Sequence, residues 1–156
     1  MINSFVQRAR EQIESMKTDA KKYMNKDFLD AAMAASALIT IADGTISREE
    51  KQKAIRFVQS NEALKVFDPN DVNRLFKSHL DALDPDNPDT DADIGEMTAF
   101  NSVEKVRKKP DQARMVLRLA IAIGGSDGDF DESEQKMASR IARGLGLEPS
   151  EFDLPS

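Results

Sequence analysis

Apolar residues recur every three or four positions along most of the chain, which is the spacing of one face of an α-helix. The sequence lacks the apolar–polar alternation of half-buried strands, so we expect an all-α helical bundle in a single domain of residues 1–156. The spacing and the capping signals predict helices over 1–24, 28–42, 47–60, 69–83, 97–106, 110–123 and 131–143, and a final turn at Pro149.

Two of these segments have the composition of buried helices. Residues 28–42 are almost uncharged and rich in Ala and Met, and residues 110–123 are strongly apolar from Met115 onward. We expect both to lie in the core, with 47–60 and 131–143 as their respective partners. The segment 1–24 is instead amphipathic with a basic polar face, which suits either packing on the bundle or contact with an anionic membrane surface.

The same helix–turn–helix motif occurs twice. Residues 43–50 and 127–134 both read Asp-Gly, any residue, a large apolar residue, Ser or Asp, any two residues and Glu, and each lies between two predicted helices. The large apolar residues are Ile46 and Phe130, which we expect to plug the core at each turn. The repeat predicts two pseudo-symmetric helix–turn–helix pairs.

Helix capping alone explains part of this motif. Ser47 with Glu50, and Asp131 with Glu134, have the spacing of a capping box, and Gly44 and Gly128 suit a left-handed helix end. Capping does not explain the acid before each glycine or the crowding of acids in the second turn. Crowded carboxylates repel one another, and a hard cation relieves that repulsion, so we also expect a cation at each turn. In the second turn its ligands are Asp127, Asp129, Asp131 and Glu134.

The order of residues in each turn matches only the second half of an EF-hand calcium loop. In both copies the glycine, the apolar residue and the final Glu are in register with that loop, but its first and third ligand positions would fall on Ile123 and Gly125, or on Ile39 and Ile41. None of these residues offers a side-chain oxygen. An ion bound here must therefore keep water molecules or recruit other carboxylates.

Composition excludes several classes of function. The chain has 28 acidic and 22 basic residues, a formal net charge of −6, which disfavours nucleic acid as a partner. The absence of cysteine excludes thiol nucleophiles and thiolate metal sites, and the single histidine, His79, excludes a two-histidine site. Any metal must therefore bind oxygen ligands, and we expect His79 at the surface or at the boundary of the core.

Residues 81–96 form the most acidic part of the chain, with seven acids, two prolines and no basic residue. This composition predicts an acidic loop, which we interpret as a solvated loop in preference to a further cation patch. The first thirty residues carry charges throughout and show no secretory signal, so we expect a cytoplasmic protein.

The two turns, together with Ser47–Lys53, Leu64–Asp68, Asp93–Glu96 and Ile141–Phe152, resemble the TerB family of tellurite-resistance proteins. The resemblance implies an all-helical bundle in a cytoplasmic bacterial protein, with a role in tellurite resistance and stress response. It further implies a divalent metal, of the Ca²⁺ kind, bound by the acids of the paired turns. By position these acids are Asp43 and Glu50 in the first turn and Asp127 and Glu134 in the second.

The resemblance also implies protein partners, namely a TerC-type membrane protein and TerD-type calcium-binding proteins, at the inner face of the membrane. Our functional hypothesis is a non-enzymatic, metal-binding adaptor. The alternative is a metal-independent interaction module whose carboxylates only cap helices. An enzyme acting on tellurite is disfavoured because the sequence shows neither cysteine nor a cofactor motif.

Overall fold

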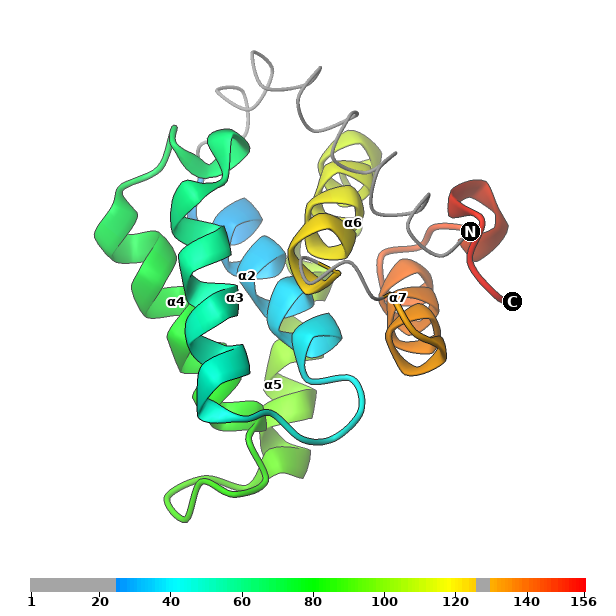
Figure 1. Ribbon diagram of the computed structural model, residues 1–156. Coiled ribbons are helices and arrows are strands. Elements are labelled where there is room, and N and C mark those ends of the chain that lie inside the picture. Colours follow the sequence, from blue (N-terminus) through cyan, green and yellow to red (C-terminus); the bar gives the residue numbers. More distant parts are fainter. Residues whose placement is uncertain (1–24, 126–129) are drawn as a thin grey trace.

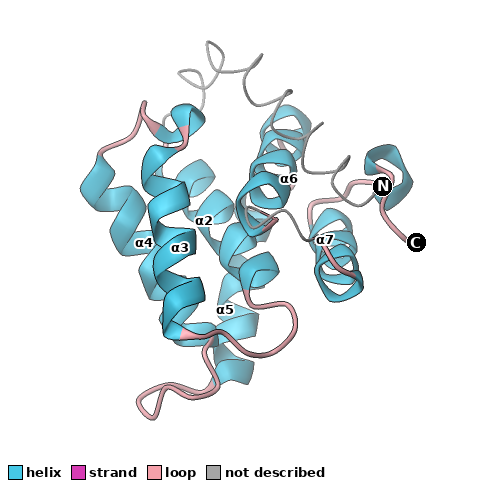
Figure 2. Ribbon diagram, in the orientation of Figure 1, coloured by secondary structure: helices cyan, strands magenta, loops and turns pink. Residues whose placement is uncertain are grey.

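The computed structural model describes residues 25–125 and 130–156, and within these ranges the chain is helical with no strand (Figure 2). The α-helices are α2 (Lys26–Thr40), α3 (Arg48–Ser60), α4 (Pro69–Leu83), α5 (Ala92–Val103), α6 (Pro110–Gly124) and α7 (Glu132–Gly144). Three short 3₁₀-helices are η2 (Glu62–Leu64), η3 (Glu104–Val106) and η4 (Pro149–Phe152). The all-α prediction is confirmed, and the helix predicted over residues 1–24 lies outside the described ranges. None of the described helices is long and apolar enough to cross a membrane.

Helix α2 forms the centre of the bundle. It contacts α4, α5, α6, α7 and η3, and these elements surround it in Figure 1. Eleven of its fifteen residues are buried, which a helix exposed on one side could not achieve. The nearly uncharged sequence of this segment therefore predicted its position correctly.

Helix α6 makes the most extensive contact with α2, and the two backbones approach closely where both helices end. Gly124 is the last residue of α6, and a Cβ atom added to it would overlap the side chain of Ile39. Glycine is therefore required at this position by the close approach of the two helices rather than by its backbone conformation. The crossing places the ends of α2 and α6 side by side.

The second helix of each repeated unit reaches across to the other unit. Helix α3 contacts α6, and α7 contacts both α2 and α6. The main neighbour of α3 is α4, whereas the sequence predicted that residues 47–60 pair chiefly with 28–42. Ile46 and Phe130 are both buried, as expected of the two plugs.

A partly buried polar cluster joins α2, α4 and η3. Asp30 on α2 accepts a hydrogen bond from His79 on α4 at 2.8 Å, and its other oxygen lies 2.8 Å from Nζ of Lys105 on η3. The expectation that His79 lies at the surface or boundary is wrong, because the residue is 8% exposed. Asp30 supplies the partner that a buried imidazole needs. The hydrogen bond from His79, opposed by burial and reinforced by Lys105, holds the pKa of Asp30 well below its usual range.

The acidic region differs from its predicted boundaries. The helices on either side extend into it, so the loop is only residues 84–91 instead of 81–96. Asp91 caps α5 through hydrogen bonds from the backbone N–H groups of Asp93 and Ile94, which starts that helix earlier than predicted. Met97 is 67% exposed, because Gly95, Ala99 and Val103 face the core.

We predict that Gly124→Ala lowers the free energy of unfolding by about 1–3 kcal/mol, because the added methyl group overlaps Ile39 and forces the two helices apart. This effect exceeds the gain of up to about 1 kcal/mol in helix propensity. Urea denaturation monitored by circular dichroism measures it. Gly144→Ala is the matched control, since its nearest neighbour would be Phe100 Cδ1 at an ordinary 3.8 Å and stability should hold or rise. Equal stability of the two variants would contradict the close-packing argument.

The Asp30 cluster makes stability depend on pH. Because the folded-state pKa of Asp30 is depressed, the unfolded chain binds this proton more readily, so the contribution of Asp30 is present above the ordinary carboxylate pKa and declines below about pH 4. We expect Asp30→Asn to cost about 1–3 kcal/mol near neutral pH, and less in acid. Urea titrations of both proteins at several pH values provide the test. A cost that stays constant into strong acid would show that the ionised carboxylate does not contribute.

Candidate metal centre

The first turn, residues 41–47, is shaped by its own backbone and side-chain hydrogen bonds. The N–H of Gly44 donates to the carbonyl of Ile41 at 2.9 Å, with Gly44 at a φ of +88°, a conformation that favours glycine. One carboxylate oxygen of Asp43 accepts a hydrogen bond from the N–H of Thr45 at 3.0 Å. The acid before the glycine is therefore a turn-forming residue whatever else it binds.

Both predicted capping boxes are present. In the first, Ser47 Oγ accepts from the N–H of Glu50 at 3.1 Å, and Glu50 Oε1 accepts from the N–H of Ser47 at 3.0 Å. In the second, Asp131 and Glu134 exchange the equivalent bonds at 2.8 and 3.1 Å. These bonds satisfy N–H groups that a helix start leaves unpaired. The capping explanation of these four residues is therefore confirmed.

The two turns open onto a single cavity of about 210 Å³. Asp43 and Glu50 contribute to it from the first turn and α3, and Asp131 and Glu134 from the second. The whole set of lining residues is Thr40, Ala42, Asp43, Glu50, Lys53, Ala54, Ile123, Gly124, Asp131 and Glu134. Gly124 and the end of α2 form part of the wall, so the close helix crossing is what brings the two turns together. Residues 80 or more positions apart in sequence thus share one acidic site.

Charge in this cavity is strongly negative. Four of the lining side chains are carboxylates and one, Lys53, is cationic. The backbone N–H of Ser47, followed by its hydroxyl, lowers the pKa of Glu50, which keeps that carboxylate ionised at neutral pH. Glu134 is 9% exposed, so its charge lies near the protein interior, where electrostatic interactions are less screened. The cavity therefore suits a cationic ligand.

The donor set has the right chemistry for a hard divalent cation. Carboxylate oxygens are the ligands that Ca²⁺ and Mg²⁺ prefer, and a capping bond engages only one oxygen of a carboxylate. Within residues 25–125 and 130–156, however, no three acidic or histidine side chains lie close enough together to hold a metal. Asp127 and Asp129, which the sequence also proposed as ligands, lie outside these ranges. A cation in the cavity would need water molecules to complete its coordination.

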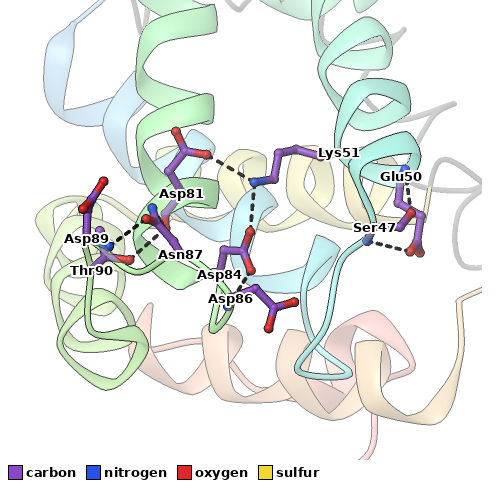
Figure 3. A network of polar contacts seen from close by, with 9 residues as sticks. All are labelled: Ser47, Glu50, Lys51, Asp81, Asp84, Asp86, Asn87, Asp89 and Thr90. Atoms are coloured by element: carbon purple, nitrogen blue, oxygen red, sulfur yellow. Dashed lines mark hydrogen bonds and ion pairs between the residues drawn. The ribbon is translucent and has the colours of Figure 1, made fainter.

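A separate network anchors the acidic loop beside the first turn (Figure 3). Lys51 on α3 places its ammonium group 3.0 Å from Asp84 and 3.3 Å from Asp81. The N–H of Asp86 and then the ammonium of Lys51 lower the pKa of Asp84. Asn87 and Thr90 donate side-chain hydrogen bonds to the carbonyl of Asp81. The loop is thus held by its own hydrogen bonds and by one lysine.

Sequence reasoning missed two residues of this region. Lys53 was not identified as a wall of the acidic cavity, although it lies one helical turn after Glu50 and therefore on the same face of α3. Lys51 was not identified as the partner of the loop, because Asp81 and Asp84 lie 30 and 33 residues away along the chain. Only the first omission had a signal in the local sequence.

Comparison with known proteins places the chain in a protein family. The chain matches the family model described as "Tellurite resistance protein TerB" over residues 29–155, a range that includes both turns. It is 32% identical over 108 residues to a protein from an Alcaligenes species described as "Tellurium resistance protein TerB", and the alignment covers 69% of this chain and 84% of that protein. No solved structure matches the chain significantly. With the family model spanning most of its length and both paired turns, this chain belongs to the TerB family of tellurite-resistance proteins.

Proposed function

We propose that this protein is a non-enzymatic tellurite-resistance and stress-response adaptor that binds a divalent cation, of the Ca²⁺ kind, between its two acidic turns. Membership of the TerB family supports a role related to tellurite resistance. The cation-binding part rests on one observation, the convergence of Asp43, Glu50, Asp131 and Glu134 on a single cavity. Its partners in this proposal are a membrane-associated Ter complex with TerC-type and TerD-type proteins.

The cation would act by neutralising the cavity. Asp43 and Glu50 would hold it from one side and Asp131 and Glu134 from the other, and its charge would offset the repulsion between the two turns. Lys53 already offsets part of that repulsion when no cation is bound. Cation binding would change the net charge of this surface, and a partner would use that change to distinguish the cation-bound protein from the cation-free protein.

The capping boxes favour a second candidate function, a metal-independent interaction module. Glu50, Asp131 and Glu134 all have a structural role at helix N-termini, so their presence does not require an ion. The two candidate functions predict different effects when a cavity glutamate is replaced by the neutral isostere glutamine. Glutamine preserves the capping bond, because its side-chain carbonyl also accepts from a backbone N–H, but it removes the charge that a cation needs.

We therefore predict that Glu50→Gln and Glu134→Gln each weaken Ca²⁺ binding by about tenfold or more while the free energy of unfolding changes by less than about 1 kcal/mol. Calorimetric titration of the chelator-treated protein with Ca²⁺, Mg²⁺ and Zn²⁺ measures the first quantity, and urea denaturation the second. Glu49→Gln is the matched control, because this exposed neighbour of Glu50 is not part of the cavity wall. Absence of saturable binding up to millimolar ion would reject the cation and favour the metal-independent module.

A second prediction concerns the effect of the positive charge of Lys53 on the affinity of the cavity for a cation. Lys53 is exposed and forms no ion pair with another described residue, so its positive charge opposes a cation in the cavity. Lys53→Met should raise Ca²⁺ affinity about threefold or more at low ionic strength, and the gain should shrink in high salt. Lys53→Arg keeps the charge and serves as the control. If Lys53→Met leaves the affinity unchanged, the ion does not bind in this cavity.

A further inference from the structure

The outer face of α5 carries an exposed apolar pair. Ile94 is 61% exposed and Met97 is 67% exposed, and these are the large hydrophobic side chains that the described part of the chain leaves most open to solvent. They lie one helical turn apart and are therefore neighbours on one face of the helix. None of the residues that line the acidic cavity belongs to α5.

Packing on the inner face prevents α5 from turning this pair inward. Gly95 is buried, and a Cβ atom added to it would overlap the carbonyl of Ala82 on α4. Ala99 and Ser102 continue this small-residue face against the bundle. The close approach fixes the rotation of α5 about its axis, so its small residues face the core and its two largest aliphatic side chains face solvent. A helix that is apolar on both faces is typical of one that is covered on both sides.

Acids without an ion-pair partner among the described residues precede the apolar pair, in the loop and at the start of α5. The sequence contains no Lys or Arg between Lys77 and Lys105, a stretch that includes the whole loop and the whole of α5. Asp86, Asp89 and Asp93 are exposed, and their carboxylates form no hydrogen bond or ion pair with any other described residue.

Two basic side chains that reach this region form ion pairs with its acids. Lys51 is paired with Asp81 and Asp84, and Arg140 is paired with Glu96 on α5. The loop and the first turn of α5 therefore carry uncompensated negative charge.

We propose that this face of α5, defined by Ile94, Met97 and the flanking acids Asp89 and Asp93, binds a basic amphipathic helix of a partner protein. The apolar residues of such a helix cover Ile94 and Met97, and its Lys or Arg residues face the acids. Charge complementarity selects this occupant, because an acidic or neutral helix would leave the carboxylates uncompensated and an anionic lipid surface would be repelled. The surface is separate from the acidic cavity, so its test does not depend on metal binding.

The probe is a labelled Leu/Lys amphipathic helical peptide of about 18 residues, compared with a Leu/Glu peptide of the same pattern and with vesicles containing anionic lipid. Fluorescence anisotropy at moderate ionic strength measures affinity, and NMR chemical shifts locate the contact. We expect saturable binding of the basic peptide, with shifts centred on residues 89–101, and no binding of the acidic peptide or the vesicles. Shifts centred elsewhere, equal binding of both peptides, or binding to the vesicles would overturn the proposal.

Two variants separate the apolar and the charged contributions. Ile94→Ser/Met97→Ser should weaken the basic peptide about tenfold or more without loss of helicity, since both side chains are exposed in the free protein. Asp89→Asn/Asp93→Asn should weaken binding of the basic peptide several-fold and make its affinity less dependent on salt concentration. Glu49→Gln/Glu148→Gln removes the same net charge from exposed positions away from α5 and should have little effect. Undiminished affinity in the Ile94→Ser/Met97→Ser variant would also overturn the proposal.

Discussion

The arrangement of this protein depends on how closely two helices can approach at a single glycine. α2 and α6 cross where Gly124 meets Ile39, and both helices end within two residues of that contact. The first Asp-Gly turn follows α2 directly, and the second acidic motif follows α6 in the sequence, so the crossing brings the two motifs together. Two local motifs that are equivalent in sequence become one site because a missing side chain allows their helices to touch. The cavity is thus a consequence of core packing as much as of the acids that line it.

A second constraint operates on the opposite side of α2. Asp30 is ionised within a largely buried setting and receives hydrogen bonds from α4 and η3. Such a group tolerates burial only while its partners are in place. Apolar packing along α2 would permit small rotations and shifts of its neighbours, whereas the directional bonds to His79 and Lys105 specify one arrangement. The mostly apolar central helix is therefore oriented by one partly buried charge.

Local features of the fold were predictable from the sequence, and features that depend on distant partners were not. The helix over 69–83, both capping boxes and the two apolar plugs follow from signals within a few residues of one another, and all are confirmed. His79 was misplaced because its partner Asp30 lies 49 residues away, and sequence spacing cannot reveal that pair. Apolar residues occur on both faces of α5, so periodicity alone could not choose which of them would face the core. For the candidate site, the acids were predictable, but their meeting in one cavity with Lys53 required the helix crossing.

The capping boxes couple the charges of the acidic cavity to the order of two helix N-termini. Glu50 and Glu134 each form part of the cavity wall and, through a backbone bond, part of the first turn of a helix. Anything that draws either carboxylate away from its N–H group loosens that turn, at a cost of about 0.5–2 kcal/mol. The order of the leading ends of α3 and α7 is therefore coupled to the electrostatic state of the space between them. In this protein the same two side chains line the acidic cavity and cap the helices beside it.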